Sequence, residues 1–264
     1  MNVTIIGCGY VGKAVAKRWK TAGHCVSVTT RNPERVAELN EIADHVILLQ
    51  GRELSAILSE QLVDQHVVLL CVAADNASQY ESTYLHTAQA LVKAVNSAPA
   101  LKQIIYTSST SVYGEHCGEW VDENTQLAPS NANTKILVTT EQTLLDLQAE
   151  TRRVCIFRLG EIIGPGREIA DRLRRMSGQS LPGTGENYTN LSELKDIVEA
   201  IDFAVSHQLG GVFNLCGDLH ITRKELYQQL CEKHGLSPVS WNTSVASIHG
   251  GNKRVSSQKL KQYQ

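Results

Sequence analysis

The sequence predicts an α/β protein built on a doubly wound parallel sheet with a smaller second lobe. Short apolar runs alternate with segments of helical periodicity as far as residue 159. The run at residues 67–72 is apolar throughout, which is typical of a parallel strand buried on both faces. A glycine-rich turn joins the first apolar run to the first helical segment. Together these observations favour repeated βαβ units.

The elements follow in order along the chain. Strands are expected at residues 3–6, 25–29, 46–49, 66–72, 103–107, 154–159 and 212–215. Helices are expected at residues 11–22, 33–40, 80–95, 134–150, 169–176 and 196–207, and from Thr222 onward, where Thr222 and Glu225 fit a capping box. After residue 164 loop signals become frequent. We therefore predict a cofactor domain at residues 1–164, completed by a strand from residues 210–216, and a substrate-side lobe at residues 165–264.

The first turn has the spacing of a dinucleotide-binding fingerprint, because it lies between a strand and a helix and reads Gly7-Cys8-Gly9-Tyr10-Val11-Gly12. Gly7 would permit the tight turn, Gly9 would let the backbone approach a pyrophosphate, and Gly12 would let the helix pack closely on the strand. The N-terminus of the helix would offer N–H groups to the phosphates. The alternative is a strand-to-helix turn without a ligand. The three spaced glycines favour a Rossmann-type cofactor site.

The end of the second strand indicates which dinucleotide would bind. NAD-binding units place an acidic residue there to hold the ribose 2′-hydroxyl. This chain has Thr30 and Arg31 instead, and its next carboxylate is Glu34. Arg31 could form a forked contact with a 2′-phosphate while Thr30 donates its hydroxyl. We therefore expect NADP(H) to be preferred over NAD(H), the alternative being that Arg31 only starts a solvated helix.

The composition narrows the class of protein. The 264 residues are 42% hydrophobic and 20% charged, with a formal net charge of −2. This balance gives no bulk attraction to nucleic acid or an anionic membrane, and no apolar stretch approaches the ~20 residues of a membrane span. The seven cysteines form no C-x-x-C pair, and the sequence runs from its first residue into a strand, which leaves no room for a signal peptide. We expect a cytoplasmic protein with free thiols and, since the histidines show no ligand spacing, no metal.

Three more segments join the glycine turn in a recognisable order. They are residues 107–114, which read Thr-Ser-Ser-Thr-Ser-Val-Tyr-Gly, residues 158–166, and residues 190–197. In this order the set resembles the extended short-chain dehydrogenase/reductase superfamily, the NAD(P)-dependent nucleotide-sugar epimerases and dehydratases. The resemblance covers nearly the whole chain and implies a Rossmann domain with a C-terminal substrate lobe. It also implies a catalytic Ser, Tyr and Lys.

The catalytic set is incomplete. Alignment on Tyr113 places the serine at Ser109, and counting back from Glu141 places Asn133 and Leu137 where the family has its Tyr-x-x-x-Lys pair. The departure resembles the atypical subgroup, which lacks the active-site tyrosine. Asn133 can hydrogen-bond a substrate oxygen but cannot take a proton at neutral pH. Tyr113 is the nearest tyrosine to Ser109 and is the other candidate for acid–base work, although its family equivalent usually packs at the strand end.

The candidate site residues fall into two groups. The expected catalytic residues are Ser109, Asn133 and Tyr113. The expected cofactor-binding residues are Gly7, Gly9, Tyr10, Val11, Gly12, Thr30, Arg31, Ala73, Ala74, Thr107 and Ser108.

Two functions fit these residues. The first is an NADP-dependent oxidoreductase or epimerase that acts on a sugar-like or small carbonyl or alcohol substrate. The second is a dinucleotide sensor or scaffold that has kept the cofactor pocket and lost catalysis. The resemblance also implies a possible homodimer through the helices at residues 80–95 and 134–150.

Overall fold

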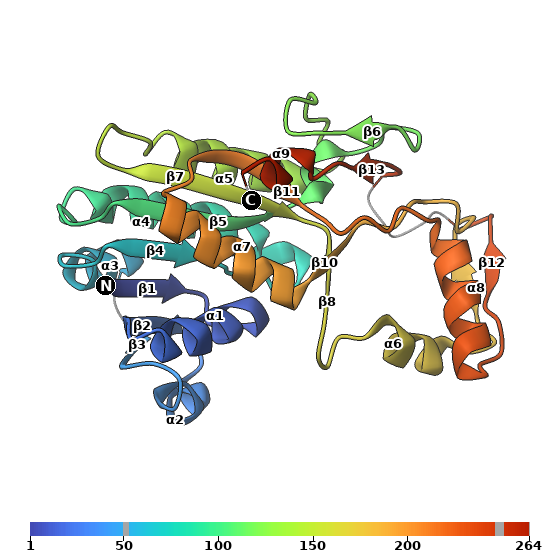
Figure 1. Cartoon of the computed structure of the whole chain (residues 1–264), viewed down its shortest axis with the longest axis horizontal. Helices are drawn as coiled ribbons and strands as arrows, with labels where there is room; N and C mark the ends of the chain where they lie inside the picture. The colour runs from blue at the N-terminus through green and yellow to red at the C-terminus, as the bar shows by residue number, and fades with distance from the viewer. Residues whose placement is uncertain (50–52, 246–250, 264) are drawn as a thin grey trace. The chain divides into compact units, whose positions relative to one another are not determined.

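The computed structural model describes residues 1–49, 53–245 and 251–263. Its largest sheet has seven strands in the order β11-β7-β5-β4-β1-β2-β3 (Figure 1). The strands are β1 (Asn2–Ile6), β2 (Cys25–Thr30), β3 (His45–Leu48), β4 (Val67–Leu70), β5 (Gln103–Ser109), β7 (Arg153–Leu159) and β11 (Gly211–Leu215). The registers β1–β2, β2–β3, β1–β4 and β4–β5 are all parallel. The strand order reverses between β1 and β4, so the predicted doubly wound α/β fold is confirmed.

The predicted helices differ from the structure mainly at their ends, but α3 (Leu54–Gln61) and α9 (Gln258–Lys261) were not predicted. The helices of the structure are α1 (Tyr10–Thr21), α2 (Val36–Asn40), α3 (Leu54–Gln61), α4 (His86–Val95), α5 (Ala132–Leu145), α6 (Ile169–Met176), α7 (Leu194–His207), α8 (Arg223–His234) and α9 (Gln258–Lys261). The segment predicted as one helix at residues 80–95 begins as a π-helix, η3 (Glu81–Leu85). The helix predicted at residues 134–150 ends at Leu145, where tight turns take over. The segment at residues 33–40 splits into a 3₁₀ turn, η1 (Pro33–Arg35), and α2.

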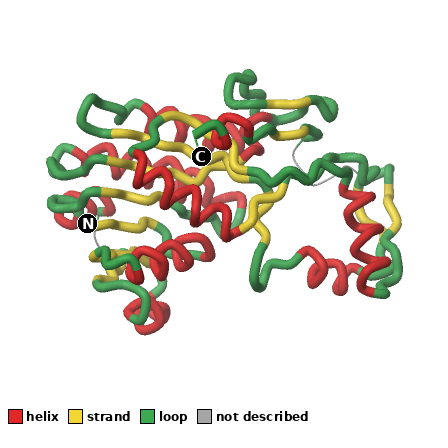
Figure 2. Tube along the Cα trace, in the orientation of Figure 1, coloured by secondary structure: helices red, strands yellow, loops and turns green. Residues whose placement is uncertain are grey.

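The chain forms two compact units. Figure 2 marks the helices, strands and loops along the chain. The first comprises residues 1–108, 135–157 and 196–212, and the second comprises residues 109–134, 158–195 and 213–264. The chain passes from the first unit to the second near the ends of β5 and β7. Each unit is therefore made of segments that alternate along the sequence. The functional division into residues 1–164 and 165–264, with residues 210–216 assigned to the first part, stays a prediction.

The core of the first unit lies on both faces of its sheet. Buried side chains of α3, α4 and α5, including Leu58, Leu91 and Leu144, pack with strand residues on one face. Helices α1 and α7 are joined by Trp19, whose indole Nε1 donates to Asp202 at 2.8 Å. Coverage of both faces explains the apolar character of the central strands.

The second unit has three short parallel strand pairs: β8 (Glu161–Ile163) with β10 (Leu191–Glu193), β9 (Ser180–Pro182) with β12 (Ser240–Asn242), and β6 (Trp120–Val121) with β13 (Arg254–Val255). Helices α6 and α8 share a small apolar core. The predicted capping box is present, because Thr222 accepts from the backbone N–H of Glu225 while the Glu225 carboxylate accepts from that of Thr222. None of the helices in the described ranges combines the length and apolar character that a membrane span requires.

Candidate functional site

The glycine turn connects β1 to α1 and contains two crowded glycines and one open one. Gly7 has φ +92°, and a Cβ there would lie 2.8 Å from the Cα and N of Val72. A Cβ on Gly12 would lie 2.6 Å from the carbonyl oxygen of Gly7. At Gly9, no heavy atom of the described residues would come within 4 Å of a Cβ, its own chain neighbours and helix aside. Gly9 caps α1, so this open space adjoins the N-terminus of a helix.

The end of β2 places two predicted residues beside this turn. Thr30 is buried, and its hydroxyl accepts from the backbone N–H of Asn32 at 3.1 Å and donates to the Asn32 carbonyl at 3.3 Å. Arg31 is exposed. The Thr30 hydroxyl is therefore used locally.

Arg35 reaches the glycine turn and was not singled out from the sequence. Its guanidinium Nη2 donates to the carbonyl oxygen of Cys8 at 2.6 Å, and its Nε lies 3.7 Å from Glu38. Lys13, in the first turn of α1, pairs with the same Glu38 carboxylate. The only sequence signal for these contacts was the i, i+3 spacing of Arg35 and Glu38, since the links to Cys8 and Lys13 cross between elements.

The remaining predicted cofactor residues lie in the same unit. Tyr10 and Val11 open α1, while Ala73 and Ala74 follow β4, where the Ala74 N–H contacts the hydroxyl of Tyr84 at 3.4 Å. Thr107 is half-buried near the end of β5.

Ser108 and Glu141 form a buried contact in the first unit. The hydroxyl of Ser108 donates to the Glu141 carboxylate at 2.6 Å, and the Glu141 side chain is nearly inaccessible. This contact joins β5 to α5 and involves the glutamate from which the sequence alignment of α5 was counted. The Ser108 hydroxyl is therefore already engaged by another residue of this chain.

Ser109 and Tyr113 belong to the second unit. Ser109 caps the short 3₁₀ turn η4 (Thr110–Tyr113), and its Oγ accepts from the N–H of Ser111 at 3.1 Å. Tyr113 is fully buried, donates to Asn214 at 2.7 Å and accepts from Arg158 at 3.0 Å. Burial raises the pKa of Tyr113, and the Arg158 guanidinium offsets this only in part. These contacts describe a structural anchor at the strand end, while Ser109 stays half-buried.

Asn133 and Leu137 lie on α5. Asn133 is half-buried in the first turn of the helix and belongs to the second unit, whereas Leu137 is buried and belongs to the first. The Leu137 side chain is aliphatic and carries no titratable group. Asn133 offers an amide only, so neither residue can exchange a proton with a substrate at neutral pH.

A second cluster that the sequence did not reveal surrounds Glu161. Its carboxylate pairs with Arg172 of α6 and lies 3.4 Å from the guanidinium of Arg223 of α8. Both arginines donate to the hydroxyl of Tyr227, at 3.4 and 3.0 Å. Arg223 is almost completely buried, so the carboxylate provides charge compensation for an arginine inside the second unit.

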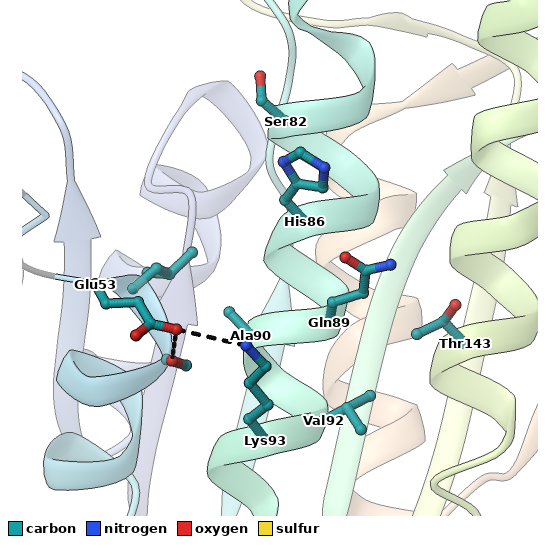
Figure 3. Close-up of a pocket in the computed structure, with 10 residues that line it drawn as sticks. Glu53, Ser82, His86, Gln89, Ala90, Val92, Lys93 and Thr143 are labelled. Atoms are coloured by element: carbon teal, nitrogen blue, oxygen red, sulfur yellow. Dashed lines mark hydrogen bonds and ion pairs between the residues drawn. The ribbon is translucent and has the colours of Figure 1, made fainter.

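A groove of about 630 Å³ lies elsewhere on the first unit (Figure 3). Side chains from the start of α3, from η3 and α4, and from Thr143 of α5 line it. Glu53 and Lys93 face each other across it at 3.5 Å. Its lining residues differ from all the predicted cofactor residues, so we do not assign the dinucleotide to it.

The remaining groups of chemical interest are potential metal ligands and the cysteine thiols. Within the described ranges, no group of three or more His, Cys, Asp or Glu side chains could hold a metal ion. The seven cysteines form no disulfide. Burial raises the pKa of Cys8, in the glycine turn, to about 11, so this thiol stays protonated at neutral pH.

Comparison with known proteins places this fold in a family. Residues 3–216 match the model of the NAD dependent epimerase/dehydratase family, and the chain belongs to it. Protein YeeZ of Escherichia coli K12 is 30% identical over 257 residues, which cover 94% of this chain and 89% of YeeZ.

Two solved structures share the fold. A functionally unknown conserved protein from Silicibacter pomeroyi has a TM-score of 0.78 at 23% identity, covering 99% of this chain and 91% of its own. A mutant of UDP-glucuronic acid 4-epimerase from Bacillus cereus, in complex with UDP-4-deoxy-4-fluoro-glucuronic acid and NAD, has a TM-score of 0.83 at 18% identity, covering 100% and 94%. At these identities the likeness concerns the fold alone.

Proposed function

We propose that this protein binds a nicotinamide dinucleotide at the turn between β1 and α1. The observation that carries the proposal is the contrast among the three glycines: Gly7 and Gly12 are required by packing, whereas Gly9 faces open space at a helix N-terminus. Packing gives no reason for a glycine at that position, but a pyrophosphate does. Membership of the epimerase/dehydratase family and the NAD bound to the Bacillus cereus enzyme support the same cofactor class.

NADP(H) is the preferred form in this proposal. Arg31 is exposed at the end of β2, and no carboxylate occurs from Thr29 to Pro33 where an NAD site would need one. Fluorescence titration with NADPH and NADH tests the preference. We expect R31A to weaken NADPH binding several-fold and to leave NADH binding nearly unchanged. Tighter binding of NADH than of NADPH by the wild type would exclude Arg31 as the determinant of a preference for NADP(H).

The proposed reaction is that of an epimerase, dehydratase or reductase on a sugar-like or small carbonyl or alcohol substrate. When bound, the nicotinamide would supply hydride transfer. Ser109 would orient the substrate oxygen and Asn133 would hydrogen-bond to it, whereas Tyr113 has its hydroxyl engaged by Arg158 and Asn214. Proton transfer then falls to water or to a residue outside the family's usual pair, which lowers the rate by ~10²–10⁴-fold without preventing the reaction.

Two measurements test this reaction. Nucleotide sugars and simple carbonyl compounds are screened for NADPH consumption and for epimerised or dehydrated products. S109A is then compared with S111A, a nearby serine whose backbone N–H, rather than its hydroxyl, contacts Ser109. We expect S109A to lose at least tenfold in kcat and S111A to retain activity. Equal activity of both variants would exclude Ser109 from the mechanism.

The alternative is a non-catalytic dinucleotide sensor or scaffold. The committed Tyr113 hydroxyl and the non-titrating side chains of Asn133 and Leu137 favour it. Tight binding of NADPH without turnover of any substrate class would support this second function.

Two further attributes belong to the proposal. We propose a cytoplasmic protein, in keeping with seven cysteines that form no disulfide. We also propose a homodimer through α4 and α5, which contribute to the groove of Figure 3. Light scattering of the wild type and of V92E, which adds a charge to that groove, tests the dimer. A monomeric wild type would exclude it.

A further inference from the structure

Three charged side chains form a cluster beside the glycine turn, all within the first unit. Lys13 projects from the first turn of α1, Arg35 ends η1, and Glu38 lies on α2. The Glu38 carboxylate pairs with Lys13 through one oxygen and lies 3.7 Å from Arg35 Nε through the other. The cluster is partly open to solvent, with side-chain exposures of 34%, 31% and 50% in the same order. A ligand can therefore reach these charges.

Arg35 fixes the location of the cluster. Its Nη2 donates to the Cys8 carbonyl at 2.6 Å, so one side chain spans the connection after β2 and the glycine turn. The connection is itself held in place, because Asn32 accepts from the N–H of Glu34 at 2.9 Å and starts the 3₁₀ turn. In this fold the adenosine ribose of a dinucleotide lies between these two segments. The three charges thus border the position of the ribose 2′ substituent.

The Glu38 carboxyl is ionised at neutral pH. Its contacts with Lys13 and then Arg35 hold the pKa of the Glu38 carboxyl below its ordinary value. A 2′-phosphate carries a charge of roughly −1.5 to −2 at pH 7 and would compete with this carboxylate for the same two cations. The 2′-hydroxyl of NAD is uncharged and would not compete for them.

We propose that Glu38 is an internal counter-ion that occupies Lys13 and Arg35 and thereby limits the preference of this site for NADP over NAD. The inference rests on the proposed dinucleotide site. Loss of the Glu38 charge leaves two cations for the phosphate and removes a repulsive charge from its surroundings. It leaves the binding of NADH nearly unchanged, because none of these effects acts on a neutral hydroxyl.

The test compares E38Q with the wild type by fluorescence titration of NADPH and NADH at low and at physiological salt. We expect the Kd for NADPH to fall by about two- to fivefold in E38Q at low salt, the range for a surface charge at such distances. The gain should shrink as salt rises, because the charges are screened. The Kd for NADH should change by less than about twofold.

E41Q is the matched control. Glu41 caps the C-terminus of α2 and is exposed, so E41Q makes the same change of charge three residues beyond Glu38. It should leave both affinities unchanged. K13M should weaken NADPH binding and spare NADH, because Lys13 supplies one of the two cations.

The outcomes separate the inference from the function on which it rests. If E38Q leaves the ratio of the two affinities unchanged, or weakens NADPH binding, Glu38 is not a competing counter-ion. If E41Q has the same effect as E38Q, the effect is one of net charge and the inference is also overturned. If the wild type binds neither nucleotide, the proposed function fails and the inference falls with it.

Discussion

Gly7 and Gly9 stand two residues apart, yet their replacement by alanine should have opposite consequences. At Gly7 the backbone has φ +92°, and the added methyl carbon would lie 2.8 Å from the Cα and N of Val72. Both are backbone atoms that follow β4, so they cannot turn aside as the end of a flexible side chain would. At Gly9 φ is −87°, so the residue lies outside the left-handed region, and the methyl carbon would find no heavy atom of the described residues within 4 Å beyond its own chain neighbours and helix.

These geometries set the magnitudes. A positive φ at a non-glycine residue costs about 1–2 kcal/mol, and overpacking a rigid site costs about 1–3 kcal/mol. G7A should therefore lower the free energy of unfolding by about 2–5 kcal/mol, a large part of the 5–15 kcal/mol typical of a folded protein. G9A should change it by no more than about 0.5 kcal/mol, as expected for a substitution without new contacts.

Urea denaturation and NADPH titration together distinguish the two variants. G7A should unfold at a clearly lower urea concentration than the wild type. G9A should unfold at the same concentration as the wild type but lose at least tenfold in NADPH affinity, because its methyl group would stand where a phosphate must approach. A G9A protein that binds NADPH normally would refute the assignment of the open space to the cofactor. A G7A protein of wild-type stability would refute the packing argument.

Two further predictions concern buried polar groups of the second unit. Y113F leaves Arg158 and Asn214 without the phenol oxygen and should lower the free energy of unfolding by about 1–3 kcal/mol; an unchanged urea midpoint would show that the hydroxyl contributes no stability. Burial lowers the pKa of Lys253, whose Nζ donates to the Gly114 carbonyl at 3.1 Å. The unfolded chain then binds this proton more tightly, so stability should rise with pH between the lowered pKa and the ordinary value of 10.5. K253M should lack that rise. If the difference in unfolding free energy between K253M and the wild type stayed constant from pH 7 upward, the lowered pKa of Lys253 would be contradicted.

Local features of the chain were predictable from sequence because they depend on neighbours. The glycine spacing between a strand and a helix predicted the turn, and Thr222 with Glu225 predicted the start of α8. The alternation of apolar strands with helices predicted the parallel sheet. Its order, with β1 between β2 and β4, is the one expected for doubly wound units.

Contacts that cross between elements were not predictable in the same way. Arg35 reaches the carbonyl of Cys8 and shares Glu38 with Lys13, although the two cations lie on different elements and far apart in sequence. Glu161 likewise meets two arginines of α6 and α8. Long side chains approach one another only after the sheet has brought their elements together, and no pattern of period two or 3.6 encodes such a meeting. The interpretation of Arg31 as the phosphate contact stays a prediction, and it was made without Lys13, Arg35 and Glu38, whose contacts the sequence did not reveal.

Ser108 and Ser109 show why the glycine turn supports binding more strongly than catalysis. They are consecutive residues at the end of β5, where successive side chains point to opposite sides. Ser108 belongs to the first unit and donates to Glu141, while Ser109 belongs to the second and caps the following 3₁₀ turn.

The first unit contains the glycine turn, Arg31 and the Glu38 cluster, so everything that the NADPH and NADH titrations probe lies within one compact unit. The expected catalytic residues all belong to the second unit: Ser109, Asn133 and Tyr113. Substitutions that alter nucleotide affinity thus need not alter chemistry, and a protein that binds NADPH tightly but turns nothing over would be fully compatible with the fold. For this reason the screen for substrate turnover, and not cofactor affinity, decides between the enzyme and the sensor.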